Sequence, residues 1–176
     1  MEIAEFINIL KKRKSIRRFK FEIEISRDKE RALLEAGRLA PSAGNMQTWH
    51  FFVVRGKALK QKIAKVAFDQ SFITQAPLVV IVAIDKIRAR RGYGKRGLEL
   101  YGIQDTAAAI QNMLLAARVM GIGSCWVGAF SEYDLEHALV IDRKRFRTVA
   151  IIPFGYPAED PPARGRMSLK KVVTYL

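Results

Sequence analysis

One short basic segment carries the densest set of groups that could bind an anion. Residues 11–20 contain seven lysines and arginines. Within this run, one turn of chain holds several donors suited to phosphate, because arginine offers paired N–H groups and serine adds a neutral hydroxyl. These donors are Arg13, Lys14, Ser15 and Arg17. The same run also fits a solvated helix end or a nucleic-acid surface.

Aromatic side chains among the charges would favour the nucleic-acid interpretation, because bases stack on them. Only Phe19 and Phe21 offer such stacking, and their alternation is typical of strand residues that face a core. The run therefore favours a compact anion site over a nucleic-acid surface, and the solvated helix end stays open.

A second polar segment lies at residues 41–49. Pro41 cannot continue the helix expected before it, and Gly44 gives the backbone freedom. Several neutral donors and acceptors follow closely, and such a cluster suits a planar heterocycle with alternating C=O and N–H groups. They belong to Ser42, Asn45 and Gln47. A plain turn between a helix and a strand accounts for the same residues, so both interpretations stand.

The remaining reactive side chains form no recognisable catalytic or metal set. His50 and His137 have no ligand-type neighbours at metal spacing, so we expect ordinary histidines and no bound metal. Cys125 has no cysteine partner, which indicates a buried, inert thiol. Gly92–Gly97 matches G-x-G-x-x-G, but the match does not directly follow a strand as a dinucleotide site requires. We expect a flexible loop or lid there.

Length and composition indicate one globular domain over residues 1–176. Hydrophobic residues make up 49% of the chain and charged residues 27%, which excludes a disordered or low-complexity chain. We see no apolar run that could cross a bilayer and no secretory signal, and the single cysteine suits a reducing compartment. We therefore expect a cytoplasmic protein without a membrane partner. The net charge of +14 favours anionic ligands.

Apolar periodicity predicts both helices and strands. Helices are expected over Met1–Lys12, from an N-cap at Ser26 to Leu39, and over Ala58–Ala67, Ile103–Met120 and Glu132–Leu139. Strands are expected over Trp49–Arg55, Leu78–Ile84, Ser124–Gly128, Thr148–Phe154 and within Arg164–Leu176. Lys86–Gly97 is expected to be an exposed loop. Because helices and strands do not alternate strictly, the pattern favours an α+β fold with a layered sheet.

The longest expected helix suggests a dimer. Of the 14 residues in Ala107–Met120, 11 are apolar. A helix that is apolar on all sides is buried in a core or at a subunit interface. A chain of this size has little room to enclose such a helix, so we expect it to face a second subunit.

Seven segments, taken in order, match the pattern of one known family. They are RKSIRRF at Arg13–Phe19, LAPSAGNMQTWHFFVV at Leu39–Val54, and the segments Ala76–Val82, Gln104–Ala117, Gly121–Phe130, Pro153–Pro161 and Arg164–Val173. Each match is weak alone, but together they are specific and cover nearly the whole chain. In this respect the chain resembles the nitroreductase family of FMN-dependent oxidoreductases.

The resemblance implies an α+β fold of three layers, in which helices flank a central, mostly antiparallel sheet. It also implies a homodimer with FMN at the interface and a C-terminal tail exchanged between subunits. Thr48 stands where the family usually has proline, which should alter the loop only modestly. Lys86–Leu100 replaces a longer helical excursion of larger members, so we expect an abbreviated lid over the pocket.

The resemblance assigns the phosphate end of the cofactor to two basic segments. Arg13, Lys14 and Ser15 would hold the FMN phosphate and ribityl region. Arg164 and Arg166 would complete that anion site.

The resemblance assigns the flavin ring to residues of four segments, of which the one with Arg17 also supplies phosphate ligands. Arg17 would lie beside the N1–C2=O edge, where its permanent positive charge would stabilise the reduced flavin. Gln70 would contact the pyrimidine edge. The other subunit would supply Pro41, Ser42, Ala43, Gly44 and Asn45. One face of the ring would be lined by Trp126, Val127 and Gly128, with a backbone N–H near N5.

The resemblance implies an enzyme that uses NAD(P)H to reduce electron-poor acceptors, such as nitroaromatics or quinones, by ping-pong hydride transfer through N5 of tightly bound FMN. The flavin carries this chemistry, so no acid–base or nucleophilic residue is required of the protein. Two alternatives stay open, a flavin-binding sensor or carrier without turnover and a basic nucleic-acid-binding protein.

Overall fold

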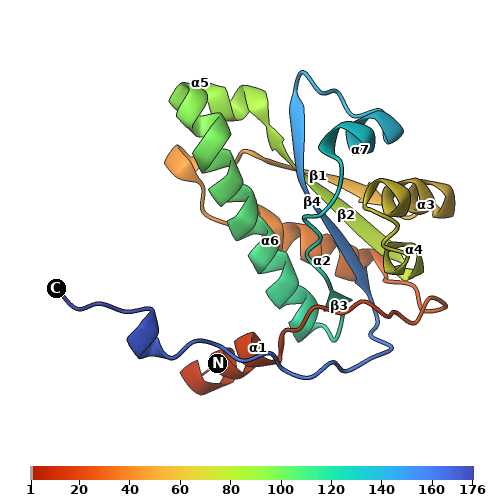
Figure 1. Ribbon diagram of the computed structural model, residues 1–176, viewed down its shortest axis with the longest axis vertical. Coiled ribbons are helices and arrows are strands. Elements are labelled where there is room, and N and C mark those ends of the chain that lie inside the picture. Colours follow the sequence, from red (N-terminus) through yellow and green to blue (C-terminus); the bar gives the residue numbers. More distant parts are fainter. Residues whose placement is uncertain (1) are drawn as a thin grey trace.

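The computed structural model describes residues 2–176 and contains a four-stranded sheet (Figure 1). Its strands are β1 (Trp49–Val54), β2 (Leu78–Asp85), β3 (Gly123–Ser124) and β4 (Phe146–Gly155). They lie in the order β1-β2-β4-β3, and each neighbouring pair is antiparallel. All eight residues of β2 are buried. The continuous apolar run therefore forms a strand covered on both faces.

Helices cover both faces of the sheet, because alternate side chains of β2 point to opposite sides. Val79 and Ile81 pack in one core with α3 (Lys57–Val66), α4 (Phe72–Gln75) and α7 (Glu132–Ala138). Leu78, Val80 and Val82 pack in a second core with α2 (Arg27–Arg38) and α6 (Gly102–Val119). This three-layer arrangement confirms the α+β fold (Figure 1).

The first helix packs little of its own surface. The helix α1 (Ile3–Lys12) begins after Glu2, which forms a reciprocal capping box with Glu5. The expected start at Met1 lies outside the described residues. None of its residues is buried, and Ile3, Phe6 and Ile7 expose their apolar side chains. The exposed apolar face of this amphipathic helix can therefore pack against another protein surface.

The longest helix is buried along one face rather than on all sides. Inward residues of α6 include Ile110, Met113 and Leu114. Ala107 and Leu115 are only half-buried, and Val119 is 67% exposed. The single chain therefore leaves one face of α6 partly uncovered, as expected for a helix that faces a second subunit, and the contact with that subunit stays a prediction.

Four local predictions are wrong. Residues 86–97 are not a loop, because Lys86–Arg96 form the helix α5, which is kinked at Tyr93 and Gly94, and a π-helical turn follows at Gly97–Tyr101. The expected strand Ser124–Gly128 reduces to Ser124 and an isolated bridge at Val127. The tail contains a 3₁₀ turn at Leu169–Lys171 and no strand. Phe19 is buried but Phe21 is 69% exposed, so the two do not face one core.

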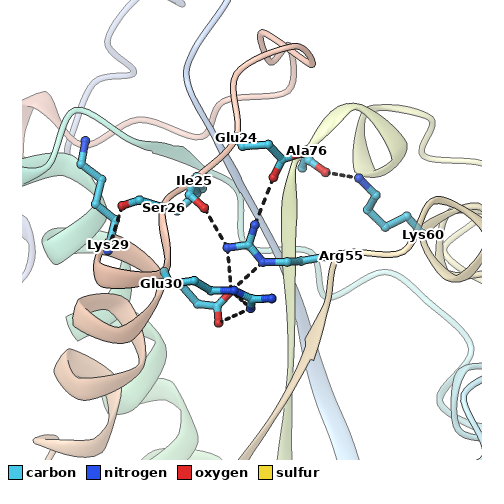
Figure 2. Close-up of polar contacts among 9 residues, drawn as sticks. Glu24, Ile25, Ser26, Lys29, Glu30, Arg55, Lys60 and Ala76 are labelled. Carbon is cyan, nitrogen blue, oxygen red and sulfur yellow. Dashed lines mark hydrogen bonds and ion pairs between the residues drawn. The ribbon is translucent and has the colours of Figure 1, made fainter.

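Arg55 connects β1 to the chain segment that leads into α2 (Figure 2). Its guanidinium donates to Glu30 at 2.7 Å, to Glu24 at 3.0 Å and to the backbone oxygen of Ile25 at 2.8 Å. Ser26 then caps α2 by accepting from the backbone N–H of Lys29, as predicted. This arrangement anchors the chain just after the basic segment. Across residues 2–176, no helix combines the length and the apolar character needed to span a membrane.

Candidate functional site

A cleft of about 620 Å³ opens between the basic segment and the C-terminal arm, defined here as residues 157–176. Six of the sequence-predicted site residues line it. Arg13, Lys14, Ser15 and Arg17 come from the segment after α1, and Arg164 and Arg166 come from the arm. Cations and one hydroxyl around a cleft of this size suit a phosphorylated ligand.

Two acidic residues of the arm hold the basic segment. The ammonium of Lys14 lies 2.7 Å from Asp160 Oδ1, and this contact lowers the pKa of Asp160. The backbone N–H of Arg17 donates to Glu159 at 2.5 Å. Because Lys14 already has an anionic partner, the arginines and Lys11 are the cations of the cleft that remain for a bound phosphate. The guanidinium of Arg17 lies 6.0 Å from the ring centre of Phe72.

The basic segment runs beside the chain that follows α6. Ser15 forms a parallel bridge with Ser124, and the N–H of Ile16 donates to the Ser124 oxygen at 2.9 Å. Two residues later, Trp126 is 40% exposed, and Val127 is buried. The predicted ring-facing segment Trp126–Gly128 is therefore close in space to the predicted phosphate residues of the same chain.

Gln70 connects this region to a strained loop. Its Nε2 donates to the backbone oxygens of Ala67 at 2.8 Å and Ala129 at 3.0 Å. Phe68 and Asp69 both have φ of 57°, in the left-handed region that disfavours side chains, and Phe68 is 69% exposed. Since such strain gathers at ligand sites, this loop joins the candidate site.

The loop at residues 41–48 is fixed from inside the protein. Asp105, in the first turn of α6, accepts from the backbone N–H of Ala43 at 3.0 Å and from the hydroxyl of Thr48 at 2.8 Å. The Ser42 hydroxyl accepts from the N–H of Gln47 at 2.9 Å. These bonds hold the 3₁₀ turn Ala43–Asn45 with its outer edge exposed.

The same loop has an unusual backbone. Gly44, Asn45 and Gln47 all have φ near 50°, at 53°, 55° and 49°. Within residues 2–176, four of the five non-glycine residues with positive φ lie either here or in the loop of Phe68 and Asp69. The two candidate ring-binding loops thus contain most of the left-handed non-glycine backbone of residues 2–176, and Val140 is the exception.

The helix α5 packs against this loop. A side chain at Gly44 would meet the Tyr93 hydroxyl at 2.5 Å, and one at Gly92 would meet Met46 Sδ at 2.8 Å. Arg88 donates to the backbone oxygen of Gln47 at 2.7 Å. Gly92 therefore allows close packing of the helix on the loop, whereas Gly94, at φ of 53°, lies at the kink of α5. The prediction of a loop over the whole segment is wrong.

The two halves of the predicted flavin site lie at opposite ends of α6 (Figure 1). Asp105 holds the loop at the first turn of α6, whereas Arg13 and Arg118 line one small cleft near its last turn. Arg118 comes thirteen positions after Asp105, which is about 20 Å of helix at 1.5 Å per residue. One chain therefore does not bring Pro41–Asn45 to the basic cleft.

Neither histidine lines the basic cleft, whereas Cys125 lies beside it, near Ser15, Arg13 and Arg17. His50 packs against two aromatic rings, with ring centres 4.6 Å from Phe52 and 4.4 Å from Phe146. Cys125 is buried and free, and burial raises the pKa of its thiol. Residues 2–176 contain no group of side chains arranged to hold a metal ion.

Four residues of the candidate site, and one that packs against it, were not predicted from the sequence. Asp105 and Glu159 accept hydrogen bonds from residues distant in the sequence, and no local sequence pattern predicts these contacts. Phe68 and Asp69 stand out only through their backbone angles. Tyr93 lies in α5, which was not predicted as a helix because its sequence contains glycines and many charges.

The chain is similar in sequence to one family of known proteins. A family model described as the Nitroreductase family matches residues 10–71 and 67–156. A Methanothermobacter thermautotrophicus protein whose name covers NADH dehydrogenase and NAD(P)H nitroreductase is 31% identical, and the match covers 91% of this chain and 81% of that protein.

Solved structures share the fold. A Desulfovibrio desulfuricans structure described as a nitroreductase in complex with FMN is 29% identical, covers 97% of this chain and 95% of its own, and has a TM-score of 0.86. A Vibrio harveyi NADPH:FMN oxidoreductase in complex with NAD+ has a TM-score of 0.87 at 23% identity, covering 96% of this chain and 76% of its own. At that identity the second structure supports the fold alone.

Proposed function

The chain belongs to the nitroreductase family, and we propose that it transfers electrons from NAD(P)H to electron-poor acceptors, such as nitroaromatics or quinones, through tightly bound FMN. The observation that carries this proposal is the cleft where Arg13, Arg17, Arg164 and Arg166 converge. The FMN complex of the 29% identical relative supports the cofactor.

The residues of the cleft fit FMN. The arginines and the Ser15 hydroxyl supply donors for a phosphate, and Glu159 and Asp160 keep the arm that carries Arg164 and Arg166 against the basic segment. When bound, FMN would supply the hydride acceptor and donor of the reaction. Arg17 would place a permanent positive charge in the cleft, which favours a more negative, reduced ligand there.

A homodimer completes the site in this proposal. Because the loop Pro41–Asn45 and the basic cleft lie at opposite ends of α6, a two-fold pairing would bring the loop of one chain to the cleft of the other. The apolar face of α1 and the arm residues Met167, Leu169 and Tyr175 are exposed and free to be covered by that partner. An arm exchanged between subunits would bury both surfaces.

The visible absorption spectrum of the purified protein tests this function. We expect a two-banded flavin spectrum after FMN is added and the excess removed, at about one FMN per chain. In oxygen-free buffer we expect continued oxidation of NAD(P)H only when an acceptor such as menadione is present. A matched pair of variants, Arg166→Ala in the cleft and Arg31→Ala on exposed α2, separates specific binding from general charge. A colourless wild-type protein contradicts the cofactor, and a yellow one without turnover favours a sensor or carrier.

A further inference from the structure

The flavin site leaves much of the positive charge of the chain unexplained. The helix α5 contains six lysines and arginines among eleven residues and no acid. A second basic run, Arg143–Arg145, lies beside its first turn, because the N–H of Lys86 donates to the backbone oxygen of Arg145 at 2.8 Å. Both runs therefore form one basic end of the molecule.

Some of these cations have anionic partners and others do not. Arg88 and Arg145 share the carboxylate of Asp85, each at 3.1 Å. Lys95 lies 3.7 Å from Glu99. Further along the same helix, Arg90 and Arg91 are exposed and form no ion pair with any of residues 2–176. Uncompensated charge at two adjacent arginines makes this surface attractive to an anion.

The position of α5 links this charge to the flavin site. Tyr93, Gly92 and Arg88 all contact the loop at residues 41–48. In the proposed dimer that loop reaches the cleft of the other chain. The helix that carries Arg90 and Arg91 therefore borders the loop, and a ligand bound beside the loop would lie near this helix.

We propose that Arg90 and Arg91 form an anion-binding surface at the entrance to the partner's flavin site. It would favour reaction partners that carry phosphate, sulfonate or carboxylate. The inference rests on the proposed function. The same chemistry could serve the 2′-phosphate of NADPH or an anionic acceptor, and the experiment separates these two sources.

The test compares two double variants of the FMN-loaded enzyme with the same change in net charge. Arg90→Glu with Arg91→Glu alters the proposed surface, and Lys57→Glu with Lys62→Glu alters exposed positions of α3. The measured quantities are two ratios of kcat/KM, NADPH to NADH and 4-nitrobenzoate to 4-nitrobenzamide. We expect at least one ratio to fall about tenfold in the α5 variant and neither to change by more than about twofold in the α3 variant.

The pattern of change identifies the source. A lower NADPH ratio assigns the surface to the donor, and a lower nitrobenzoate ratio assigns it to the acceptor. If the α5 variant does not retain FMN, Arg90→Gln with Arg91→Gln is compared with Lys57→Gln with Lys62→Gln by the same two ratios, and equal ratios in both variants overturn the proposal.

Other outcomes overturn the proposal. Equal ratios in both variants and the wild type do so, as does an equal fall in both variants, which would reflect net charge alone. Unchanged ratios combined with loss of DNA binding in the α5 variant would assign the surface to nucleic acid. Wild-type protein without FMN or turnover would instead contradict the proposed function itself.

Discussion

The hydroxyl of Thr48 donates a hydrogen bond of 2.8 Å to Asp105 Oδ2, although 57 positions separate the two residues. Both side chains are buried, and the other carboxylate oxygen accepts from the N–H of Ala43. A proline at position 48 could not make the side-chain bond, so the threonine adds an attachment between the loop and α6.

Thr48→Val removes this hydroxyl while keeping the shape of the side chain. A buried carboxylate oxygen then loses its donor, and we expect the free energy of unfolding to fall by about 2 kcal/mol. Thr48→Ser keeps the donor and serves as the matched control. Urea unfolding of both variants measures this free energy. An equal loss of unfolding free energy in both would mean that packing of the threonine methyl group matters more than the hydrogen bond.

Arg17→Ala removes the permanent charge expected beside the reduced flavin. We expect the flavin midpoint potential to become more negative by tens of millivolts, on the order expected for one nearby charge in a partly screened site. Arg18→Ala, at the exposed neighbouring position, is the control. Redox titration of both holoproteins measures the effect, and an unchanged potential in the Arg17 variant would contradict the role given to that residue.

Mixed dimers test whether each site draws on two chains. One chain would carry Arg13→Ala with Arg166→Ala, which weakens the basic cleft, and the other Gly44→Val, which distorts a loop at φ of 53°. Each homodimer should bind little FMN. Purified mixed dimers should regain one intact site, or about one FMN per two chains, because a two-fold pair has two equivalent sites.

The matched control for this experiment is a mixed dimer in which one chain carries all three substitutions and the other carries none. In the proposed arrangement both of its sites contain a damaged half, so it should bind little FMN. The reverse pattern, with FMN only in this control, would show that the loop and the cleft of one chain serve the same site.

His50 makes stability depend on pH. Burial, followed by the positive charge of Arg88, lowers its pKa below the ordinary value of 6.5. The unfolded chain therefore takes up a proton at higher pH than the folded protein does, and stability falls as the pH drops below about 6.5. His50→Gln should flatten the dependence of unfolding free energy on pH between 7 and 5, as measured by urea titration. An unchanged slope would assign the dependence to other groups.

Much of the fold could be predicted from the sequence, because its strongest patterns are local. The apolar run of β2 and the periodicity of α6 mark elements whose burial follows from composition. The helix α5 was not predicted, because two glycines and six cations obscure its pattern. Asp85 stabilises it by accepting from the N–H groups of Ile87 and Arg88, a cap that the apolar pattern does not reveal.

Some residues of the candidate site could likewise be predicted from the sequence, and others could not. The residues that would bind phosphate are adjacent in sequence or follow a family motif, so Arg13 and Arg166 could be named from the chain alone. The bond between Thr48 and Asp105 and the left-handed backbone of Phe68 depend on the folded structure. A strand was expected in the arm because its apolar residues resemble one, but no edge of the sheet pairs with it in the single chain.

The length of α6 has a consequence for how the cofactor is kept. If each flavin is held between a cleft on one chain and a loop about 20 Å along the helix of another, release of the cofactor and separation of the subunits become linked equilibria. Dilution would then release FMN from the protein, and added FMN would slow subunit exchange.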